Sequence, residues 1–129
     1  MLWIPHADIS RQDIARFVAK ERIADETLRD AIRRAEAGQI DADLGGGVIK
    51  QRVARSGGGK SGGYRTIVFY RRDTRAVFPY GFAKNDRDNI DPDELRDFRD
   101  AARTILALTE ADMNKAVTNG AFREITEDE

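Results

Sequence analysis

Residues 64–83 read YRTIVFYRRDTRAVFPYGFA, and this stretch decides the fold class. Its first part, residues 64–70, is rich in β-branched and aromatic side chains, which is typical of a strand. The polar run Arg71–Arg75 predicts a hairpin turn, and residues 76–83 predict the returning strand. So short a connection makes the two strands antiparallel neighbours. Pro79 cannot donate to a strand ladder, so we expect an edge position or a β-bulge there.

A third strand and two helices are predicted before this hairpin. Residues 48–54 alternate apolar and basic side chains, as a half-buried strand does. Residues 10–21 and 25–37 carry apolar side chains at helical spacing. The linker 40–47 has turn chemistry, and residues 55–63 form a loop that contains five glycines.

Two further helices are predicted after the hairpin. Asp91 is a helix N-cap and Pro92 takes the first helical position, which predicts a long helix from this point. Thr109 is the N-cap of a short helix that ends near Gly120. The order predicts an α+β fold: two N-terminal helices packed on a small antiparallel β-sheet, followed by a C-terminal helix, with the helices all against one face of the sheet.

Length and composition bound the class of protein. The 129 residues are expected to form one domain, with residues 1–9 and 126–129 flexible. The absence of cysteine excludes disulfides, thiolate metal sites and a cysteine nucleophile. The first residues lack the basic and apolar regions of a signal peptide, and no apolar run is long enough to span a bilayer. We therefore expect a cytoplasmic protein with no membrane partner.

The formal net charge of −1 hides a strong asymmetry along the chain. Residues 50–87 hold ten Lys and Arg against two Asp, a formal charge of +8, whereas the rest of the chain carries −9. A basic segment between acidic flanks is the pattern that a polyanion-binding surface leaves in a sequence. The alternative, a well-solvated charged surface, is equally compatible with the charges alone.

Two familiar kinds of site do not fit the sequence. The run Gly58–Ser61 resembles the end of a phosphate-binding loop, but that motif needs glycine where Ala54 stands and a helix where residues 64–70 predict a strand. His6 is the only histidine, so a zinc site or a histidine-dependent nuclease pair cannot be built. The basic segment holds no acidic cluster for magnesium. We therefore expect neither a metal nor another cofactor.

Without metal or histidine, RNA cleavage has one economical route, in which the 2′-hydroxyl attacks the adjacent phosphate while cations neutralise the developing charge. Arg65 begins the strongest strand directly after a glycine-rich loop, and Lys60 lies within that loop. Tyr80 and Lys84 are four residues apart, so an extended strand places them on the same face. The alternative is that Tyr80 is a core aromatic and that the charges are solvated strand edges.

Three separated blocks of sequence resemble a known toxin group. They are Ile40–Lys50 with Arg52–Arg55, then Gly59–Thr66, then Tyr80–Asn85, and the closing segments Leu108–Asp112 and Ala116–Gly120 are similar as well. Together they resemble the RelE/ParE superfamily, in the RelE/HigB-like group, over about residues 14–125. The first helix departs from the pattern, because Arg16–Val18 stands where the group has an aromatic Phe-x-x-Trp.

The resemblance implies the toxin of a type II toxin–antitoxin system with a RelE/ParE-like fold. The implied activity is a ribosome-dependent mRNA endoribonuclease, an mRNA interferase that inhibits translation and leaves a 2′,3′-cyclic phosphate and a 5′-hydroxyl. Carried over to this chain, Arg65 binds the scissile phosphate, and Tyr80 and Lys84 assist proton transfer or charge neutralisation. Further phosphates of RNA are held by basic residues of the same segment: Lys50, Arg52, Arg55 and Lys60.

The resemblance also implies partners and leaves two alternatives. The partners are a cognate antitoxin with a helix-turn-helix domain, the ribosome and its mRNA, and operator DNA reached only through the antitoxin. The first alternative is a ParE-like inhibitor of DNA gyrase, and the second is a non-catalytic corepressor or interaction module. The residues that separate them are Lys60, Arg65, Tyr80 and Lys84, because a gyrase inhibitor does not need to focus these groups on one phosphate.

Overall fold

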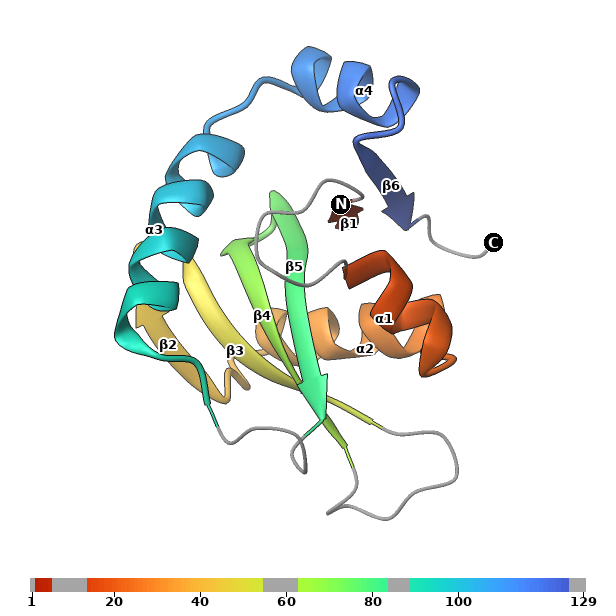
Figure 1. Cartoon of the computed structure of the whole chain (residues 1–129). Helices are drawn as coiled ribbons and strands as arrows, with labels where there is room; N and C mark the ends of the chain where they lie inside the picture. Colours follow the sequence, from red (N-terminus) through yellow and green to blue (C-terminus); the bar gives the residue numbers. More distant parts are fainter. Residues whose placement is uncertain (1, 6–13, 55–62, 84–88, 126–129) are drawn as a thin grey trace.

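The structure is a computed structural model that describes residues 2–5, 14–54, 63–83 and 89–125 (Figure 1). In chain order the elements are β1 (Leu2–Pro5), α1 (Ile14–Lys20), α2 (Asp25–Glu36), β2 (Ala42–Gly45), β3 (Val48–Val53), β4 (Tyr64–Arg71), β5 (Arg75–Ala83), α3 (Pro92–Leu106), α4 (Glu110–Thr118) and β6 (Phe122–Ile125). The predicted α+β class is confirmed.

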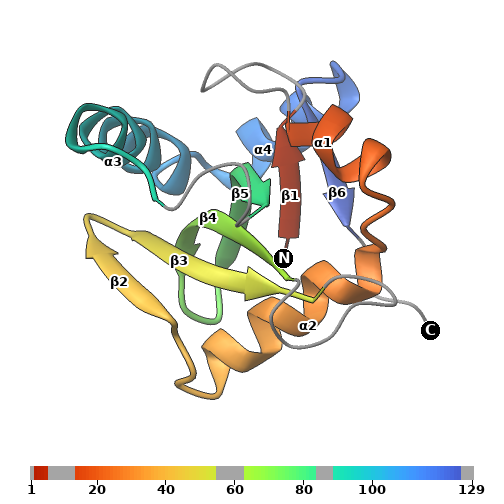
Figure 2. The same cartoon turned by 60° about the horizontal axis from the view of Figure 1, so that its bottom comes forward.

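The strands form one mixed sheet in the order β2-β3-β4-β5-β1-β6. Neighbouring strands pair antiparallel except β1 and β5, which are parallel. Helices α1 and α2 lie against one face and α3 lies against the other, so that β3 runs between α2 and α3 (Figure 2).

The prediction that the helices share one face of the sheet is therefore wrong. The reason lies in β4, where the consecutive residues Ile67, Val68 and Phe69 are all fully buried. Successive side chains of a strand point to opposite faces, so a continuous apolar run needs cover on both. Val68 packs with α1 and α2, whereas Ile67 and Phe69 pack with α3.

The N-terminus also differs from the prediction. Residues 2–5, expected to be flexible, form β1 between β5 and β6, and Trp3 and Ile4 are almost completely buried there. A strand of four residues with partners more than seventy residues away leaves little local signal in a sequence. The same holds for β6, which pairs with β1 and which the sequence did not predict. Strand β2, within the predicted turn 40–47, pairs with the neighbouring β3 but is equally short. Residues 126–129 lie outside the described ranges.

The hairpin between β4 and β5 forms as predicted, and its turn residue Asp73 has a positive φ of 60°. Pro79 does not lie at an edge, because β5 is flanked by β4 and β1. It lies in a β-bulge, which was the other position predicted for it. Ile67 pairs with Tyr80 but Phe69 pairs with Val77, so Phe78 and Pro79 together oppose one residue of β4 in a β-bulge.

Helix α3 begins with the predicted cap. The Asp91 carboxylate accepts a hydrogen bond from the backbone N–H of Glu94, and the Glu94 carboxylate accepts one from the N–H of Asp91. Thr109 caps α4 in the same way through the N–H of Asp112. Helix α3 then packs through Phe98 and Ala102 onto the sheet.

A buried cation ties the end of α3 to the sheet. Arg75, the first residue of β5, is 2% exposed and donates from Nη1 to the carbonyl of Ile105 at 2.7 Å. Its Nη2 lies 3.2 Å from Oε1 of Glu110 in α4, and its guanidinium lies 5.6 Å from the centre of the Trp3 ring in β1. One side chain thus joins β5, α3, α4 and β1.

The turn between β2 and β3 supports α3 from the other side. Gly45, Gly46 and Gly47 all have positive φ, and the Arg99 guanidinium of α3 donates to the carbonyl of Leu44. A Cβ on Gly47 would lie only 2.7 Å from Cδ1 of Leu106. This close approach of turn and helix needs glycine on two grounds, its backbone conformation and its lack of a side chain.

We expect Gly47→Ala to destabilise the protein by about 1–3 kcal/mol more than Gly38→Ala, because it adds overpacking against α3 to the cost of a positive φ. Gly38 is a matched control, since its φ is +87° against +84° for Gly47 and no atom lies within 4 Å of its Cβ position. Urea unfolding of both variants measures the difference. Equal losses of stability would show that α3 does not press on this turn.

The β4–β5 hairpin packs against the end of α2. The backbone N–H of Asp73 donates to the carboxylate of Glu36, and Arg72 donates to the Glu36 carbonyl at 3.0 Å. Burial of the Tyr70 hydroxyl, and then the neighbouring Glu36 carboxylate, raise the pKa of Tyr70 to about 12. The folded protein therefore holds this proton more tightly than the unfolded chain does.

The raised pKa of Tyr70 predicts a loss of stability at high pH. A group whose pKa is higher in the folded state stabilises fully below its unfolded value, here 10, and this contribution disappears as the pH rises toward about 12. We expect Tyr70→Phe to lose less stability than the unmodified protein between pH 10 and 12. Urea midpoints across this range measure the effect, and parallel curves for the two proteins would contradict it.

Candidate functional site

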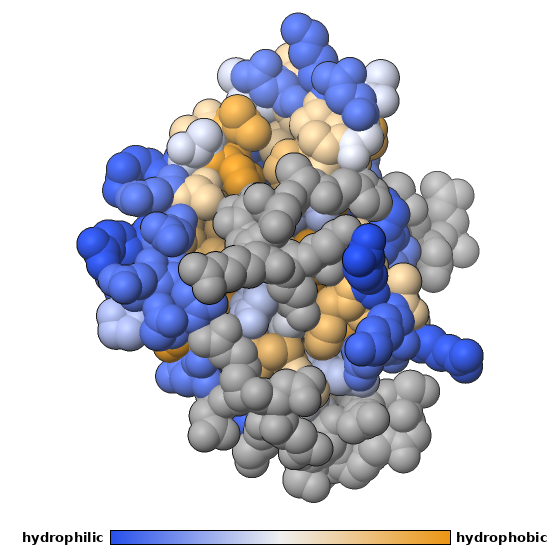
Figure 3. All heavy atoms as spheres, viewed as in Figure 1, coloured by the Kyte–Doolittle hydropathy of each residue, from blue (hydrophilic) through white to orange (hydrophobic). Residues whose placement is uncertain are grey.

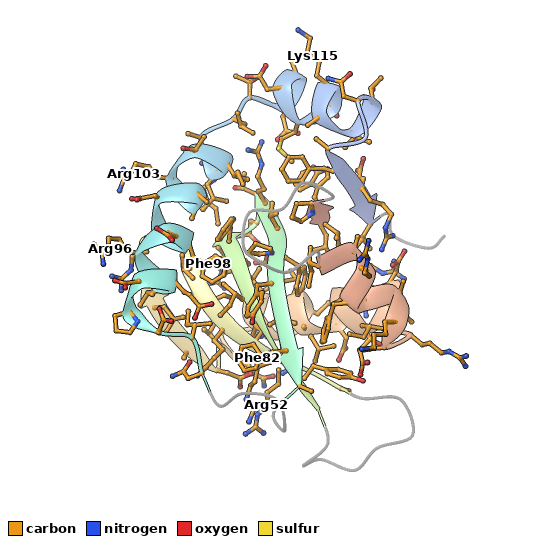
Figure 4. All side chains as sticks on the ribbon, viewed as in Figure 1. Arg52, Phe82, Arg96, Phe98, Arg103 and Lys115 are labelled. Atoms are coloured by element: carbon orange, nitrogen blue, oxygen red, sulfur yellow. The ribbon has the colours of Figure 1, made fainter. Side chains whose placement is uncertain are left out.

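The sheet face that α3 covers carries a group of basic side chains with aromatic neighbours. We call its cations, Lys50, Arg52 and Arg65, the basic row. Arg52 of β3 pairs with Arg65 of β4, which pairs with Phe82 of β5. Two residues further along each strand, Lys50 pairs with Ile67, which pairs with Tyr80. Paired residues of neighbouring strands share a face, so these six side chains lie on one surface. Phe98 points toward it from α3, while Arg52 lies at its lower end and points away from the core (Figure 4).

Arg52 and Arg65 are two cations placed directly opposite each other. Arg52 is exposed and Arg65 is half-buried. Within the described residues, neither guanidinium has an ion-pair or hydrogen-bond partner. Like charges directly across two strands destabilise a sheet. An anion bound between the two guanidiniums would remove that repulsion, so this pair has the electrostatics of a phosphate site.

Lys50 lies one row further into the sheet and is partly buried. Its Nζ lies 3.5 Å from Oδ1 of Asn89, two residues before the cap of α3. This contact brings the start of α3 to the basic row, although Asn89 was not among the residues singled out from the sequence.

Tyr80 occupies the boundary between this row and the core. Its ring lies 5.7 Å from that of Phe82 and 5.8 Å from that of Phe98, and the residue is 9% exposed. It is the diagonal neighbour of Arg65, a position that lies about 7–8 Å away between Cα atoms and within reach of long side chains. The ring is thus a core aromatic, as the alternative from sequence had it, and it stands on the same face as Arg65.

Three of the residues that the resemblance singled out, Arg55, Lys60 and Lys84, lie outside the described ranges. The structure therefore brings together Lys50, Arg52, Arg65 and Tyr80. Phe98 is an addition to this set, and its contact with Tyr80 has no local signal in the sequence because it joins two elements through residues eighteen positions apart.

Helix α1 supports β5 from the opposite face. Gly81 lies between Tyr80 and Phe82, and a Cβ on it would lie 2.9 Å from the Phe17 ring. Phe17 also meets Tyr64 edge to face, with ring centres 5.5 Å apart. The Tyr64 hydroxyl donates to Glu21 at 2.8 Å, beside a hollow of about 180 Å³ that is separated from the basic row by the sheet. Glycine at position 81 thus lets α1 lie close behind the row.

The described residues are also informative about metal sites and membrane-spanning helices. No group of three or more His, Cys, Asp or Glu that could hold a metal ion occurs among these residues. No helix in the same ranges is long and apolar enough to cross a membrane. The outer surface of α3 is strongly hydrophilic, and Arg96 and Arg103 project from it into solvent (Figures 3 and 4). Each of these two arginines is paired with an aspartate of its own helix.

The arrangement can bind a phosphate and stabilise charge that develops on it. Arginine keeps its proton, so Arg52 and Arg65 serve as electrostatic clamps and not as bases. A lysine amine or a tyrosine hydroxyl can exchange a proton, provided that it reaches the reacting oxygen. The described part of the site therefore offers two fixed cations, one amine and one hydroxyl.

Comparison with known sequences assigns the chain to a family. Residues 9–125 match the family described as RelE toxin of RelE / RelB toxin-antitoxin system. No curated protein matches the chain. The family match spans both helical layers, all three central strands and the basic row, and it confirms the resemblance found in the sequence. The chain belongs to the RelE toxin family of toxin–antitoxin systems.

Proposed function

We propose that the chain is a ribosome-dependent mRNA endoribonuclease that inhibits translation when its antitoxin is absent. The observation that carries the proposal is the Arg52–Arg65 pair, two opposed guanidiniums without an acidic partner among the described residues, on the face that also holds Lys50 and Tyr80. Two uncompensated cations on a rigid sheet fit a phosphodiester better than they fit a structural role.

The proposed reaction is an intramolecular transesterification. The 2′-oxygen of the ribose forms a bond to the adjacent phosphorus while the bond from phosphorus to the 5′-oxygen breaks. The 2′-hydroxyl gives up its proton to a base, and the leaving 5′-oxygen takes one from an acid. The products are a 2′,3′-cyclic phosphate and a 5′-hydroxyl, so atoms and charge balance without a redox partner.

Each residue has one proposed role in this step. Arg65 binds the non-bridging oxygens and stabilises the negative charge that accumulates on them. Tyr80 and Lys84 exchange protons at the two reacting oxygens, with Tyr80 oriented by its contacts with Phe82 and Phe98. The remaining cations hold the phosphates on either side: Lys50, Arg52, Arg55 and Lys60.

The proposed setting is the cytoplasm, where the ribosome positions the mRNA against the basic row. The cognate antitoxin is proposed to cover that row with acidic side chains and to repress the shared operon through a helix-turn-helix domain. Covering the cations both blocks the substrate and neutralises the repulsion between Arg52 and Arg65.

Removing Arg65 tests the proposed clamp. We expect Arg65→Ala to lower the cleavage rate by about 10²–10³-fold, the usual effect of deleting one group that stabilises transition-state charge. Arg71→Ala is the matched control, because Arg71 lies on the same strand and face but at the far end, opposite Arg75. Growth arrest after induction and cleavage of mRNA on purified ribosomes are the two measurements.

The Arg65 experiment has clear contrary results. Unchanged growth arrest by a folded Arg65→Ala protein would refute the assignment of the site. Equal losses in Arg65→Ala and Arg71→Ala would mean that only the total charge matters. Circular dichroism and urea unfolding of both variants show that they fold.

Mapping of 5′ ends tests the reaction itself. Induction without antitoxin is expected to produce new mRNA 5′ ends within translated codons, each with a hydroxyl and not a phosphate. RNA with a 2′-O-methyl group at the cut position should resist cleavage, because the nucleophile is blocked. Absence of new ends, together with inhibition of gyrase in a supercoiling assay, would replace the ribonuclease by a ParE-like activity.

A further inference from the structure

A side chain of α2 donates a hydrogen bond to the backbone of β3 next to the candidate site. Strand β2 pairs with β3 only as far as Lys50, so the backbone of Arg52 lies beyond the end of β2. The N–H of Arg52 donates to Oδ2 of Asp41 at 2.6 Å, and its carbonyl accepts a hydrogen bond from Nη2 of Arg34. Arg34 thus lies beside Arg52 at the open edge of the sheet.

Through this contact the line of arginines extends beyond the sheet face onto α2. Arg65 on β4 pairs with Arg52 on β3, and Arg52 is bonded through its backbone to Arg34 on α2. Arg52 therefore has one of these arginines opposite it on the next strand and the other bonded to its backbone carbonyl. The line begins on the α3 face of the sheet and turns around the edge of β3 toward α2, which lies beneath the opposite face (Figure 2).

We propose that Arg34 is an RNA-binding residue, and that the strand held at Arg65 continues over the edge of β3 toward α2. This inference rests on the proposed function, because it extends the path of the same substrate. It adds a phosphate contact from a helix that no part of the sequence pattern connects with the site. The ligand is single-stranded RNA, because the substrate of the proposed function is mRNA.

The neighbouring Arg33 differs from Arg34 in its contact with the sheet. Arg33 is 56% exposed and its ion pairs are with its own helix, 3.1 Å from Oε1 of Glu26 and 4.0 Å from Oδ1 of Asp30. Arg34 shares Asp30, with Nε at 3.9 Å, and is 33% exposed, but its Nη2 also reaches the carbonyl of Arg52 in β3. Among the described residues, Asp30 contacts the side chain of Arg34 and Asp41 contacts the backbone of Arg52. Within the same ranges, these two carboxylates stand against the three positive charges of Arg34, Arg52 and Arg65.

The experiment compares Arg34→Gln with Arg33→Gln, which remove the same charge from adjacent positions. Glutamine at position 34 removes the charge but is too short to take over the bond of Nη2 to the Arg52 carbonyl, so the melting temperature of each variant is measured beside its affinity. The probe is a fluorescent single-stranded RNA with 2′-O-methyl groups throughout, which cannot be cleaved by the proposed reaction. Fluorescence anisotropy at several salt concentrations gives the affinity and its salt dependence.

We expect Arg34→Gln to reduce the slope of log K against log salt by about 0.7, the value for one phosphate contact of a single strand. Arg33→Gln should leave the slope unchanged, and Arg34→Lys should restore it. Equal slopes for Arg34→Gln and Arg33→Gln would overturn the proposal. If Arg34→Gln melts early, both variants are titrated well below its melting temperature: a lowered slope for Arg34→Gln there supports the proposal, and a slope equal to that of Arg33→Gln contradicts it.

Arg65→Ala separates this inference from the function on which it rests. If Arg65→Ala loses RNA affinity and Arg34→Gln behaves like Arg33→Gln, the proposed function stands and only the extension around β3 is refuted. If Arg65→Ala binds and cleaves RNA normally, the proposed function itself is refuted, whatever the result at Arg34.

Discussion

The guanidinium of Arg75 is the contact on which the second layer of the fold depends. It is almost completely buried, and it satisfies the end of α3, the start of α4 and the face of the Trp3 ring at once. Breaking a buried charged contact of this kind costs about 3–5 kcal/mol, a large part of the stability of a small domain. Because α3 brings Phe98 to Tyr80, a cation at one end of β5 also holds the aromatic side of the candidate site at the other.

The two ends of the α3 face use positive charge in opposite ways. At the Arg75 end the cation is buried, bonded to a helix carbonyl and paired with Glu110. At the other end Arg52 and Arg65 stand opposite each other at the margin of the helix cover, where solvent and ligands can reach them. Arg75 thus has a structural role, whereas Arg52 and Arg65 are available to bind a ligand. These roles differ because Arg75 is buried and bonded, whereas Arg52 is exposed and Arg65 is half-buried.

The central hairpin, all four helices and the family could be predicted from the sequence, because their signals are local: apolar periodicity, the Asp91 cap and turn residues. The N-terminal strand could not, because Leu2–Pro5 is defined by partners at positions 76–77 and 122–125. For the site, alternation predicted that Tyr80 and Lys84 share a face, and Lys84 lies outside the described ranges. That Arg65 and Tyr80 share a face depends on the register of β4 against β5, which the sequence does not show. The contribution of Arg34 could not be predicted, because it depends on where β2 stops pairing with β3 and on a contact from another layer.

The bulge at Phe78–Pro79 has a consequence for how this protein can evolve. On either side of it the strand is out of phase by one residue, since Val77 and Tyr80 both face α3 although three positions separate them. Loss of the codon for Phe78 or for Pro79 would restore regular alternation and leave Val77 and Tyr80 two positions apart, both still facing α3. Loss of a codon elsewhere within β5 would instead turn the residues on one side of the deletion to the opposite face. The bulge is therefore the place where this strand can be shortened without exchanging the side chains of its core for those of its site.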